Sequence, residues 1–263
     1  MMIDLFEMLN TFGNEQARLA ASGFGIFIRV GAMMAVLPAF GEQVIPIRVR
    51  LGITLAFTAI AAPAIMPMMP PFMLSPGPLM TLILAEALAG LTLGIGLRFF
   101  VIALQTAGTI AAQATSLSQF FGGAGVDPQP AMSQILVMGG LALAVTAGLH
   151  VRLAELIVLS YSFFPPARFP DAASLGEWGV AHAARAFTLA FTLAVPFVML
   201  SLLFYIALGA INKAMPQLMV AFVGAPAITW GGLAVLLLTA PLLLPVWHDA
   251  FQGFLIDPVA LPR

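Results

Sequence analysis

The sequence predicts an all-α integral membrane protein whose helices are interrupted by proline and glycine. Of its 263 residues, 61% are hydrophobic and only 8% are charged, whereas charged residues make up about 25% of a typical soluble domain. The 10 basic and 11 acidic side chains are too few to cover the surface of a soluble monomer of this size. The 20 prolines and 24 glycines are many for so apolar a chain, so we expect breaks within its helices.

The same composition excludes several classes of protein. The low charge content and the net charge of −1 exclude an ordinary cytosolic enzyme, a disordered protein and a basic nucleic-acid binder. The absence of cysteine excludes disulfide scaffolds and thiolate metal sites. His150, His182 and His248 are scattered without a second ligand at helical spacing, so we expect no metal site. Neither a P-loop nor a nucleophile elbow is present, and we expect no cofactor and no enzymatic activity.

Seven stretches are predicted as membrane spans, because a helix needs about 20 apolar residues to cross the hydrocarbon core. They are residues 19–37, 51–66, 79–97, 99–121, 131–149, 186–211 and 217–247. The stretch 153–165 is apolar but too short to cross alone, so we expect a re-entrant or interfacial helix there. Hydropathy does not separate helices in lipid from helices of a tightly packed oligomer, because both bury apolar surface on all sides.

The chain shows no linker and no change in composition, so residues 1–263 are predicted to form a single domain. Residues 1–14 carry apolar side chains at helical spacing. They are expected to form a short amphipathic helix in the membrane interface, or a leader segment with no role of its own. Residues 165–180 are the most polar interior segment and are predicted to form a loop.

Two charged residues, Arg29 and Glu86, lie inside predicted spans. A charge at membrane depth is unfavourable unless it is paired, so we predict an ion pair between the first and third spans. The pair would fix the packing of helices within the chain or at a subunit interface. A proton relay would require more buried carboxylates. Gly90 and Gly94 have the spacing that allows another helix to approach closely, although this motif is common.

The most unusual stretch is 105–130, QTAGTIAAQATSLSQFFGGAGVDPQP. Its first part places polar side chains on one helix face, and such a stripe should face protein or water rather than lipid. The stripe consists of Gln105, Thr109, Gln113 and Ser116. It leads into a glycine-rich break that contains Gln119, Phe120, Phe121, Gly122, Gly123, Gly125, Asp127 and Pro128. The pattern is typical of a gate or plug in a conduit, or of an ordinary external turn with two phenylalanines at the interface.

A second polar break follows the sixth predicted span. Asn212, Pro216 and Gln217 are predicted to form a polar turn, and Gly224 and Pro226 to interrupt the next apolar helix. Backbone groups freed at such an interruption need protein neighbours. We therefore predict packing against other subunits here, with a kinked but ordinary span as the alternative.

Four groups of residues resemble the FliR family of type III protein export, which includes the injectisome counterparts called SctT. The matching segments are RVGAMMAVLPAFGEQVIPIRVRLG at 29–52, with Arg29, Pro38, Gly41, Pro46, Arg48 and Arg50 as its framework, AGTIAAQ at 107–113 with Asp127 and Pro128, Gly148 and His150 followed by SYSFFP at 160–165, and NKAMPQLMVAFVGAP at 212–226. The last segment is the most specific. The chain departs from the family pattern in having Ala114 and Thr115 after the glutamine and Leu149 before the histidine.

The resemblance implies a core component of an export gate in the bacterial inner membrane, at the flagellar basal body or, less in keeping with the overall likeness, in an injectisome. It implies assembly with FliP and FliQ family subunits into a helical, pseudo-symmetric conduit. FlhB family proteins would wrap that conduit, and FlhA family proteins would lie beneath it. Unfolded export substrates would pass through it, the complex would contact membrane lipid, and no nucleic acid would be involved.

The resemblance also assigns roles to residues of this chain. The loop 116–128 would act as a plug, with Phe120 and Phe121 as its sealing side chains. Residues expected at packing or subunit interfaces are Arg29, Arg50, Glu86, Asn212, Pro216, Gln217, Gly224 and Pro226. The alternative function is a stand-alone secondary transporter of small molecules or ions. Such a transporter should show related halves with paired broken helices, and we see no internal repeat.

Overall fold

The computed structural model describes residues 2–38, 45–69, 76–115, 131–215 and 220–260, and within them it contains helices and no strand. The helices are α1 (Met2–Val36), α2 (Ile47–Ile65), the 3-10 turn η1 (Met66–Met68), α3 (Pro76–Ala114), α4 (Ala131–Thr146), α5 (Leu149–Phe163), α6 (Ala172–Ala214) and α7 (Val220–Ile256). The predicted all-α class is confirmed.

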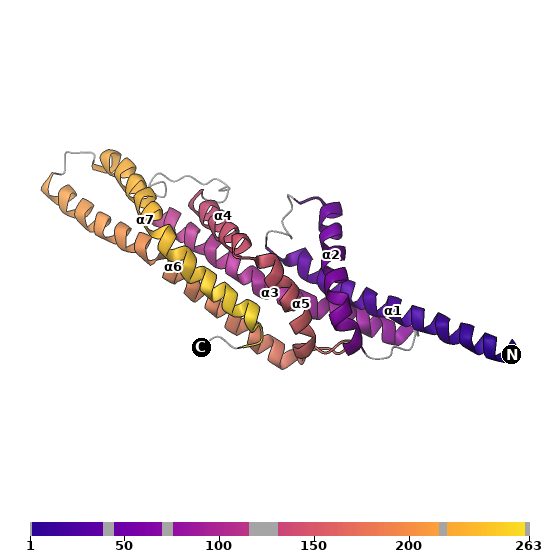
Figure 1. The fold of residues 1–263 in the computed structure, drawn as a ribbon. Coiled ribbons are helices and arrows are strands. Elements are labelled where there is room, and N and C mark those ends of the chain that lie inside the picture. Colours follow the sequence, from indigo (N-terminus) through magenta and orange to yellow (C-terminus); the bar gives the residue numbers. More distant parts are fainter. Residues whose placement is uncertain (1, 39–44, 70–75, 116–130, 216–219, 261–263) are drawn as a thin grey trace.

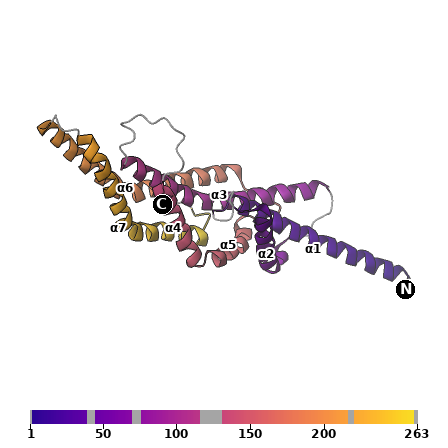
Figure 2. The same ribbon diagram turned by 90° about the horizontal axis from the view of Figure 1, so that it is seen from above.

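The molecule is long and narrow, with α3 running through its middle (Figure 1). α1 extends to one end, and the hairpin of α6 and α7 extends to the other; the view from above shows the same arrangement (Figure 2). The accessible surface is 15224 Å², whereas a compact monomer of this mass would expose about 11,000 Å². The chain alone therefore leaves far more surface uncovered than a compact protein does.

The predicted number of seven spans is wrong. Five helices in the described residues are long and apolar enough to cross a membrane, or six spans are obtained if α4 and α5 count as one bent span. The stretches 79–97 and 99–121 were predicted as two spans, but as far as Ala114 they form the single helix α3. Arg98, which separates the two predicted stretches, lies within this helix, and its Nη1 donates to the carbonyl oxygen of Val36 at 3.4 Å.

The amino-terminal part also differs from the prediction. α1 runs without a break from Met2 to Val36, so residues 2–14 continue into the first predicted span and do not form a separate short helix. Residues 153–163 of the predicted segment 153–165 belong to α5, which meets α4 at an angle of 75°. Gly148 forms this corner with φ of 87°, a left-handed conformation that favours glycine.

The predicted loop 165–180 is helical from Ala172 onward. Asp171 caps the new helix, because its Oδ2 accepts a hydrogen bond from the amide of Ser174 at 2.8 Å. The predicted interruption at Gly224 and Pro226 is also wrong, since α7 continues through it and contains Pro226, Pro241 and Pro245. Proline is tolerated inside membrane helices where neighbouring groups satisfy the freed carbonyls.

Glycines allow α3 to pack closely against two neighbours. A Cβ atom at Gly94 would lie 2.8 Å from the carbonyl oxygen of Met33, and one at Gly90 would collide with the backbone of Arg29. The close helix approach predicted for Gly90 and Gly94 is thereby confirmed, and its partner is α1. A Cβ atom at Gly108 would likewise collide with the backbone of Ser133 on α4.

Two buried tryptophans fasten the end of α7 to α3 and α6. Trp247 Nε1 donates to the carbonyl oxygen of Phe100 at 2.8 Å, and Trp178 Nε1 donates to that of Pro258 at 2.7 Å. The ring of Phe254 lies near both Phe100 and Trp178, at centroid distances of 5.6 and 6.4 Å. These contacts satisfy both indole groups in an apolar environment and fix where the α6–α7 hairpin leaves the body.

Candidate functional site

The body of the molecule is held by a buried charge pair. Arg29 of α1 and Glu86 of α3 are 2% and 0% exposed. Arg29 Nε lies 2.7 Å from Glu86 Oε2, and its Nη2 lies 3.2 Å from Oε1. This two-point geometry is the strong form of an arginine–carboxylate interaction. The predicted ion pair is confirmed, and it joins two helices of the same chain.

The remaining hydrogen-bonding groups of the pair are satisfied by α5 and the turn that follows it. Arg29 Nη1 donates to Ser160 Oγ at 3.1 Å, and its Nη2 donates to the Phe164 carbonyl oxygen at 2.9 Å. The guanidinium carbon lies 3.6 Å from the centre of the Tyr161 ring. A cation over an aromatic face adds further attraction when it is desolvated. The arginine thus contacts three separate segments of the chain.

Glu86 has a matching set of donors. Its Oε2 accepts from the Tyr161 hydroxyl at 3.0 Å, and its Oε1 accepts from the Ala167 amide at 3.1 Å. Ala167 has φ of 56°, a conformation unfavourable for a residue with a side chain. The carboxylate therefore holds the α5–α6 turn in a strained shape. We call Arg29, Glu86, Ser160, Tyr161 and Ala167 the buried charge cluster.

Sequence reasoning found two members of this cluster and missed the others. Ser160 and Tyr161 appeared only as letters of the SYSFFP motif, 131 or more residues from Arg29. A buried ion pair needs further hydrogen-bonding partners. The hydroxyl groups of Ser160 and Tyr161, which stand within an apolar segment, were therefore the sequence feature that could have indicated these partners. Because every group of the cluster is satisfied within the chain, its geometry is that of a structural anchor.

The polar stripe of α3 lies partly against α4 and partly on the surface. Gln105 and Thr109 are half-buried, whereas Gln113 is exposed. The Thr109 hydroxyl donates to the Gln105 carbonyl oxygen at 2.8 Å, and Ser133 Oγ of α4 donates to the same oxygen at 3.1 Å. The stripe therefore leads from a helix contact to an open polar position at the end of α3.

Most residues of the predicted plug fall outside the described part of the chain. These are Ser116, Gln119, Phe120, Phe121, Gly122, Gly123, Gly125, Asp127 and Pro128. The two ends of that connection are described. Thr115 is buried, its hydroxyl lies 3.9 Å from Met132 Sδ, and a Cβ atom on Gly232 would lie 2.7 Å from it. The connection 116–130 thus starts and ends on closely packed helices.

The remaining predicted interface residues are not brought together with the buried charge cluster. Arg50 is half-buried near the start of α2, and Asn212 is exposed near the end of α6. Gly224 is buried at the α6–α7 contact, where a Cβ atom would lie 3.0 Å from Leu208, and Pro226 is exposed. Pro216 and Gln217 lie outside the described residues. A role of these residues in subunit packing stays a prediction.

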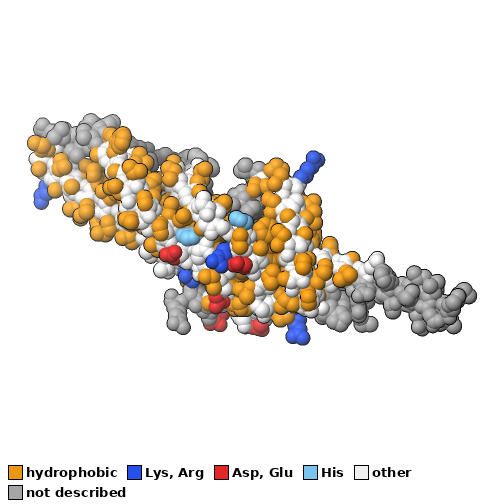
Figure 3. Space-filling view, in the orientation of Figure 1, with side chains coloured by type: hydrophobic (Ala, Val, Ile, Leu, Met, Phe, Trp, Pro, Cys, Tyr) orange, Lys and Arg blue, Asp and Glu red, His pale blue; other side chains and the backbone are white. Residues whose placement is uncertain are grey.

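The α6–α7 hairpin exposes apolar side chains along most of its length. In the space-filling view its surface is mainly hydrophobic apart from a basic group near its far end, and the acidic side chains lie in the middle and along the lower edge of the molecule (Figure 3). Side chains at least half exposed on the hairpin include Phe187, Phe191, Leu203, Ile206, Trp230, Leu237, Leu238 and Leu242. Within the described residues, no group of three or more histidine or acidic side chains converges as a metal site would.

The described residues form long apolar helices around an internal ion pair whose polar groups are hydrogen-bonded. They define a class of protein: a helical membrane protein with extensive apolar surface that its own chain does not cover. Comparison with known proteins names the family. The family model for bacterial export proteins, family 1, matches residues 20–254. The chain therefore belongs to this family, the one that its motifs resemble.

Curated relatives agree with that assignment. The flagellar biosynthetic protein FliR of Caulobacter vibrioides is 34% identical over 232 residues, which cover 88% of this chain and 92% of that protein. FliR of Escherichia coli is 28% identical over 239 residues, covering 87% and 88%. FliR of Bacillus subtilis is 29% identical over 213 residues, covering 76% and 79%. With the five helices in its described part that are long and apolar enough to cross a membrane, the chain is a membrane protein of the flagellar export apparatus.

Proposed function

We propose that this chain is a core subunit of the flagellar type III export gate in the bacterial inner membrane. It lines part of a conduit for unfolded export substrates, and its residues 116–128 plug that conduit at rest. The observation that carries the proposal is the polar face of α3, which becomes exposed at Gln113 and leads directly into the connection 116–130. Membership of the export family supplies the system in which this face acts.

The polar face argues for a water-filled or protein-lined environment. In lipid, an exposed glutamine amide has no hydrogen-bonding partner, and each unsatisfied polar group costs several kcal/mol. Gln113 is exposed at the end of a helix that is otherwise apolar. A surface facing a conduit satisfies this side chain, and a surface facing lipid does not.

The connection has the length and composition of a plug. It comprises the 15 residues 116–130, so a fully extended loop that goes out and returns reaches about 25 Å at roughly 3.3 Å per residue. The composition of the connection includes Gly122, Gly123 and Gly125, and glycine permits backbone conformations that other residues resist, as a plug that opens and closes requires. Phe120 and Phe121 supply bulky apolar groups to exclude water.

The uncovered surface fits a subunit of a larger assembly. α3, with 39 residues, is about 58 Å long at 1.5 Å per residue, which exceeds the roughly 40–45 Å of a whole bilayer with its headgroups. Part of this helix therefore lies outside lipid and needs protein around it. FliP and FliQ family subunits would cover it, with FlhB and FlhA family proteins at the periphery of the complex.

The alternative, a transporter that works alone, predicts unpaired charges at membrane depth that bind a substrate. Among the Lys, Arg, Asp and Glu side chains that the structure describes, Arg29 and Glu86 are the buried ones, and they are occupied with each other and with α5. Co-purification in mild detergent separates the two functions: the gate subunit is recovered in a large hetero-oligomer, and the transporter as a single chain active after reconstitution.

Deletion of residues 122–125 tests the plug. We expect increased ion leak across the membrane at rest, altered secretion of flagellar substrates, or both, because the shortened loop no longer fills the conduit. A deletion of the same size at the carboxyl terminus, residues 260–263, serves as the control and should leave both readouts near those of the native chain. Unchanged leak together with unchanged secretion in the 122–125 variant contradicts the plug assignment.

A further inference from the structure

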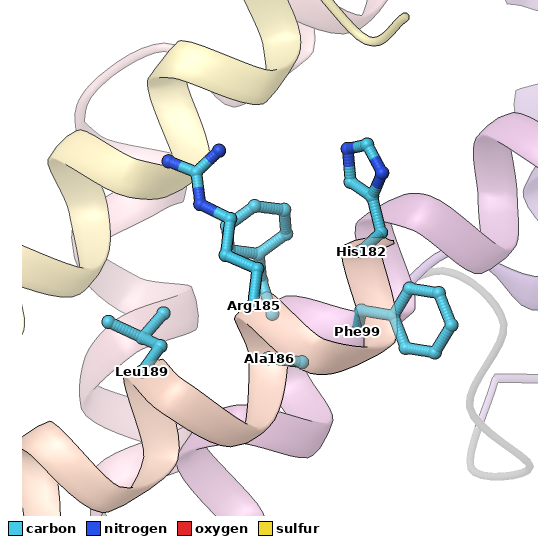
Figure 4. A pocket seen from close by; sticks show the side chains of 6 residues that line it. Phe99, His182, Arg185, Ala186 and Leu189 are labelled. Atoms are coloured by element: carbon cyan, nitrogen blue, oxygen red, sulfur yellow. The ribbon is translucent and has the colours of Figure 1, made fainter. Parts of the chain in front are cut away.

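Arg185 of α6 is a half-buried cation without a partner in the described part of the chain. Neither a hydrogen bond nor an ion pair joins its guanidinium to another group in the described ranges. The close-up shows its side chain extending from α6 toward α7, whereas the ring of Phe99 points elsewhere (Figure 4). His182, three residues earlier, holds the Trp178 carbonyl oxygen at 3.0 Å through Nδ1 and carries no negative charge.

The acidic residues of the three helices around Arg185 do not supply its counter-charge. Glu86 of α3 is bound within the buried charge cluster. Glu177 lies eight residues earlier in α6, which is about 12 Å along the helix axis at 1.5 Å per residue. Asp249 of α7 is exposed, and no ion pair joins it to Arg185. The counter-charge therefore has to come from beyond these three helices.

The space enclosed beside the guanidinium is too small for a ligand. The cavity between α3 and α6 at this point, lined by Phe100, Ala186 and Leu189, has a volume of about 10 Å³, roughly the room that one water molecule needs. An anion must therefore approach Arg185 from its exposed outer side. A free anion there meets the guanidinium alone, whereas an acidic side chain of a second protein is also held by the contacts around it.

The surface at that level of the hairpin is apolar and uncovered. α6 and α7 run antiparallel (Figure 1), and the ring centres of Trp178 and Phe254 are 6.4 Å apart. Arg185 lies seven residues further along α6, so it is level with the turn of α7 that contains Val246. Val246 is 49% exposed, and Leu242, one turn away, is 69% exposed. Contiguous apolar surface of this kind marks a contact site.

A protein that covers Val246 and Leu242 also removes water from the exposed part of Arg185. Removing water from a guanidinium is unfavourable unless an anion replaces it. A carboxylate matches the guanidinium in a two-point geometry, and arginine is the cation best suited to ion pairs at protein interfaces. The chemistry of this face thus specifies what its partner must carry: a carboxylate with apolar groups beside it.

We propose that this face of the α6–α7 hairpin binds a neighbouring subunit of the export gate, which places an Asp or Glu carboxylate on Arg185 and apolar side chains on Val246 and Leu242. The inference rests on the proposed function, because it requires that the chain assembles with other subunits. It does not depend on the plug, since it involves no residue of 116–128.

Assembly of the full chain with its partner subunits tests the contact. Arg185→Gln should weaken the association by about thirtyfold or more, measured as the fraction of tagged chain in the hetero-oligomer on native gels over a dilution series in mild detergent, because the partner's buried carboxylate loses its cation. Arg185→Lys keeps the charge and should recover part of the loss. Arg152→Gln is the matched control, because Arg152 is exposed and already paired with Glu155 at 2.9 Å, and it should assemble like the native chain.

Two further measurements separate a partner's carboxylate from a role inside the chain. The Arg185→Gln chain purified alone should melt near the native temperature, because Arg185 has no partner within the described residues. Arg185→Glu should abolish assembly and swimming motility. Selection for restored motility should return substitutions that replace an acidic residue of a partner subunit by lysine or arginine, whereas adding Asp249→Arg to Arg185→Glu should restore neither assembly nor motility.

The proposal is overturned if Arg185→Gln assembles like the native chain, including the case in which it loses only a bound anionic lipid. It is also overturned if Asp249→Arg restores the Arg185→Glu chain, which would make the pair internal, or if the isolated Arg185→Gln chain melts well below the native one. A native chain that enters no hetero-oligomer contradicts the proposed function itself, and this inference with it.

Discussion

Arg29 and Glu86, where α1, α3 and α5 meet, are almost completely buried and have all their partners within the chain. Leu237 and Leu238, on α7, are 77% and 71% exposed and have none of the cover that such side chains need. The body therefore specifies its own structure through internal contacts. The α6–α7 hairpin instead depends on lipid or other subunits to bury its surface. A subunit that folds before it joins an assembly is expected to have one region stabilised by internal contacts and another whose apolar surface is buried only after assembly.

The largest effect is expected from breaking the buried charge cluster. Arg29→Ala leaves the Glu86 carboxylate buried without its cation, which should destabilise the protein by about 3–5 kcal/mol. We expect a lower melting temperature in detergent and weaker assembly with partner subunits on native gels. Fully assembled complexes at native levels would show that the pair is dispensable.

A double substitution sharpens this prediction. Arg29→Met combined with Glu86→Leu removes both charges and should recover part of the stability lost in Arg29→Ala, because well-packed apolar groups can replace a buried ion pair. A double variant as unstable as Arg29→Ala would indicate that the α5–α6 turn, rather than charge burial, decides the effect. The double variant also removes the hydrogen bond from the Ala167 amide to the Glu86 carboxylate, which holds this turn.

A pair of glycine substitutions compares body and hairpin directly. Gly108→Ala places a methyl group into the backbone of Ser133, and overpacking of this kind typically costs about 1–3 kcal/mol. Gly209→Ala on α6 meets no atom within 4 Å and should be neutral or stabilising by up to about 1 kcal/mol, because alanine favours the helix. Equal melting temperatures for the two variants would contradict the comparison.

The smallest effect concerns the cap of α6. Hydrogen bonds from the Ser174 amide and hydroxyl hold the pKa of the Asp171 carboxyl below its usual range. A carboxyl with a lowered pKa in the folded state stabilises the protein above its unfolded pKa, and the stabilisation is lost as pH falls through the folded value. The native chain should exceed Asp171→Asn slightly in melting temperature at neutral pH, and the gap should close below about pH 4. A gap that widens in acid would refute this.

The features that could be predicted from the sequence are those set by local chemistry. An arginine and a glutamate inside apolar runs have few ways to be satisfied other than by each other, so the Arg29–Glu86 pair followed from the residues alone. The spacing of Gly90 and Gly94 indicated a close helix contact for the same kind of reason, because a missing side chain permits backbone approach.

Features that depend on distant neighbours were not predicted. The two spans predicted on either side of Arg98 form one helix, α3, and the Val36 carbonyl that accepts the hydrogen bond of Arg98 lies 62 residues earlier in the chain. Asp171 was assigned to a loop, although an aspartate after Pro170 and before an apolar run is a typical helix start. Ser160 and Tyr161 contact Arg29 only because α5 folds back at Gly148.

Crosslinking to a trapped export substrate tests the conduit most directly. The chain has no cysteine, so single cysteines introduced at Gln113 and Phe120 report on those positions alone, with Leu237→Cys on the exposed apolar face of α7 as the control. With a substrate stalled in the export apparatus, we predict crosslinks from positions 113 and 120 and none from position 237. Substrate that is stalled yet crosslinks at neither 113 nor 120, or equally at 237, would contradict the account.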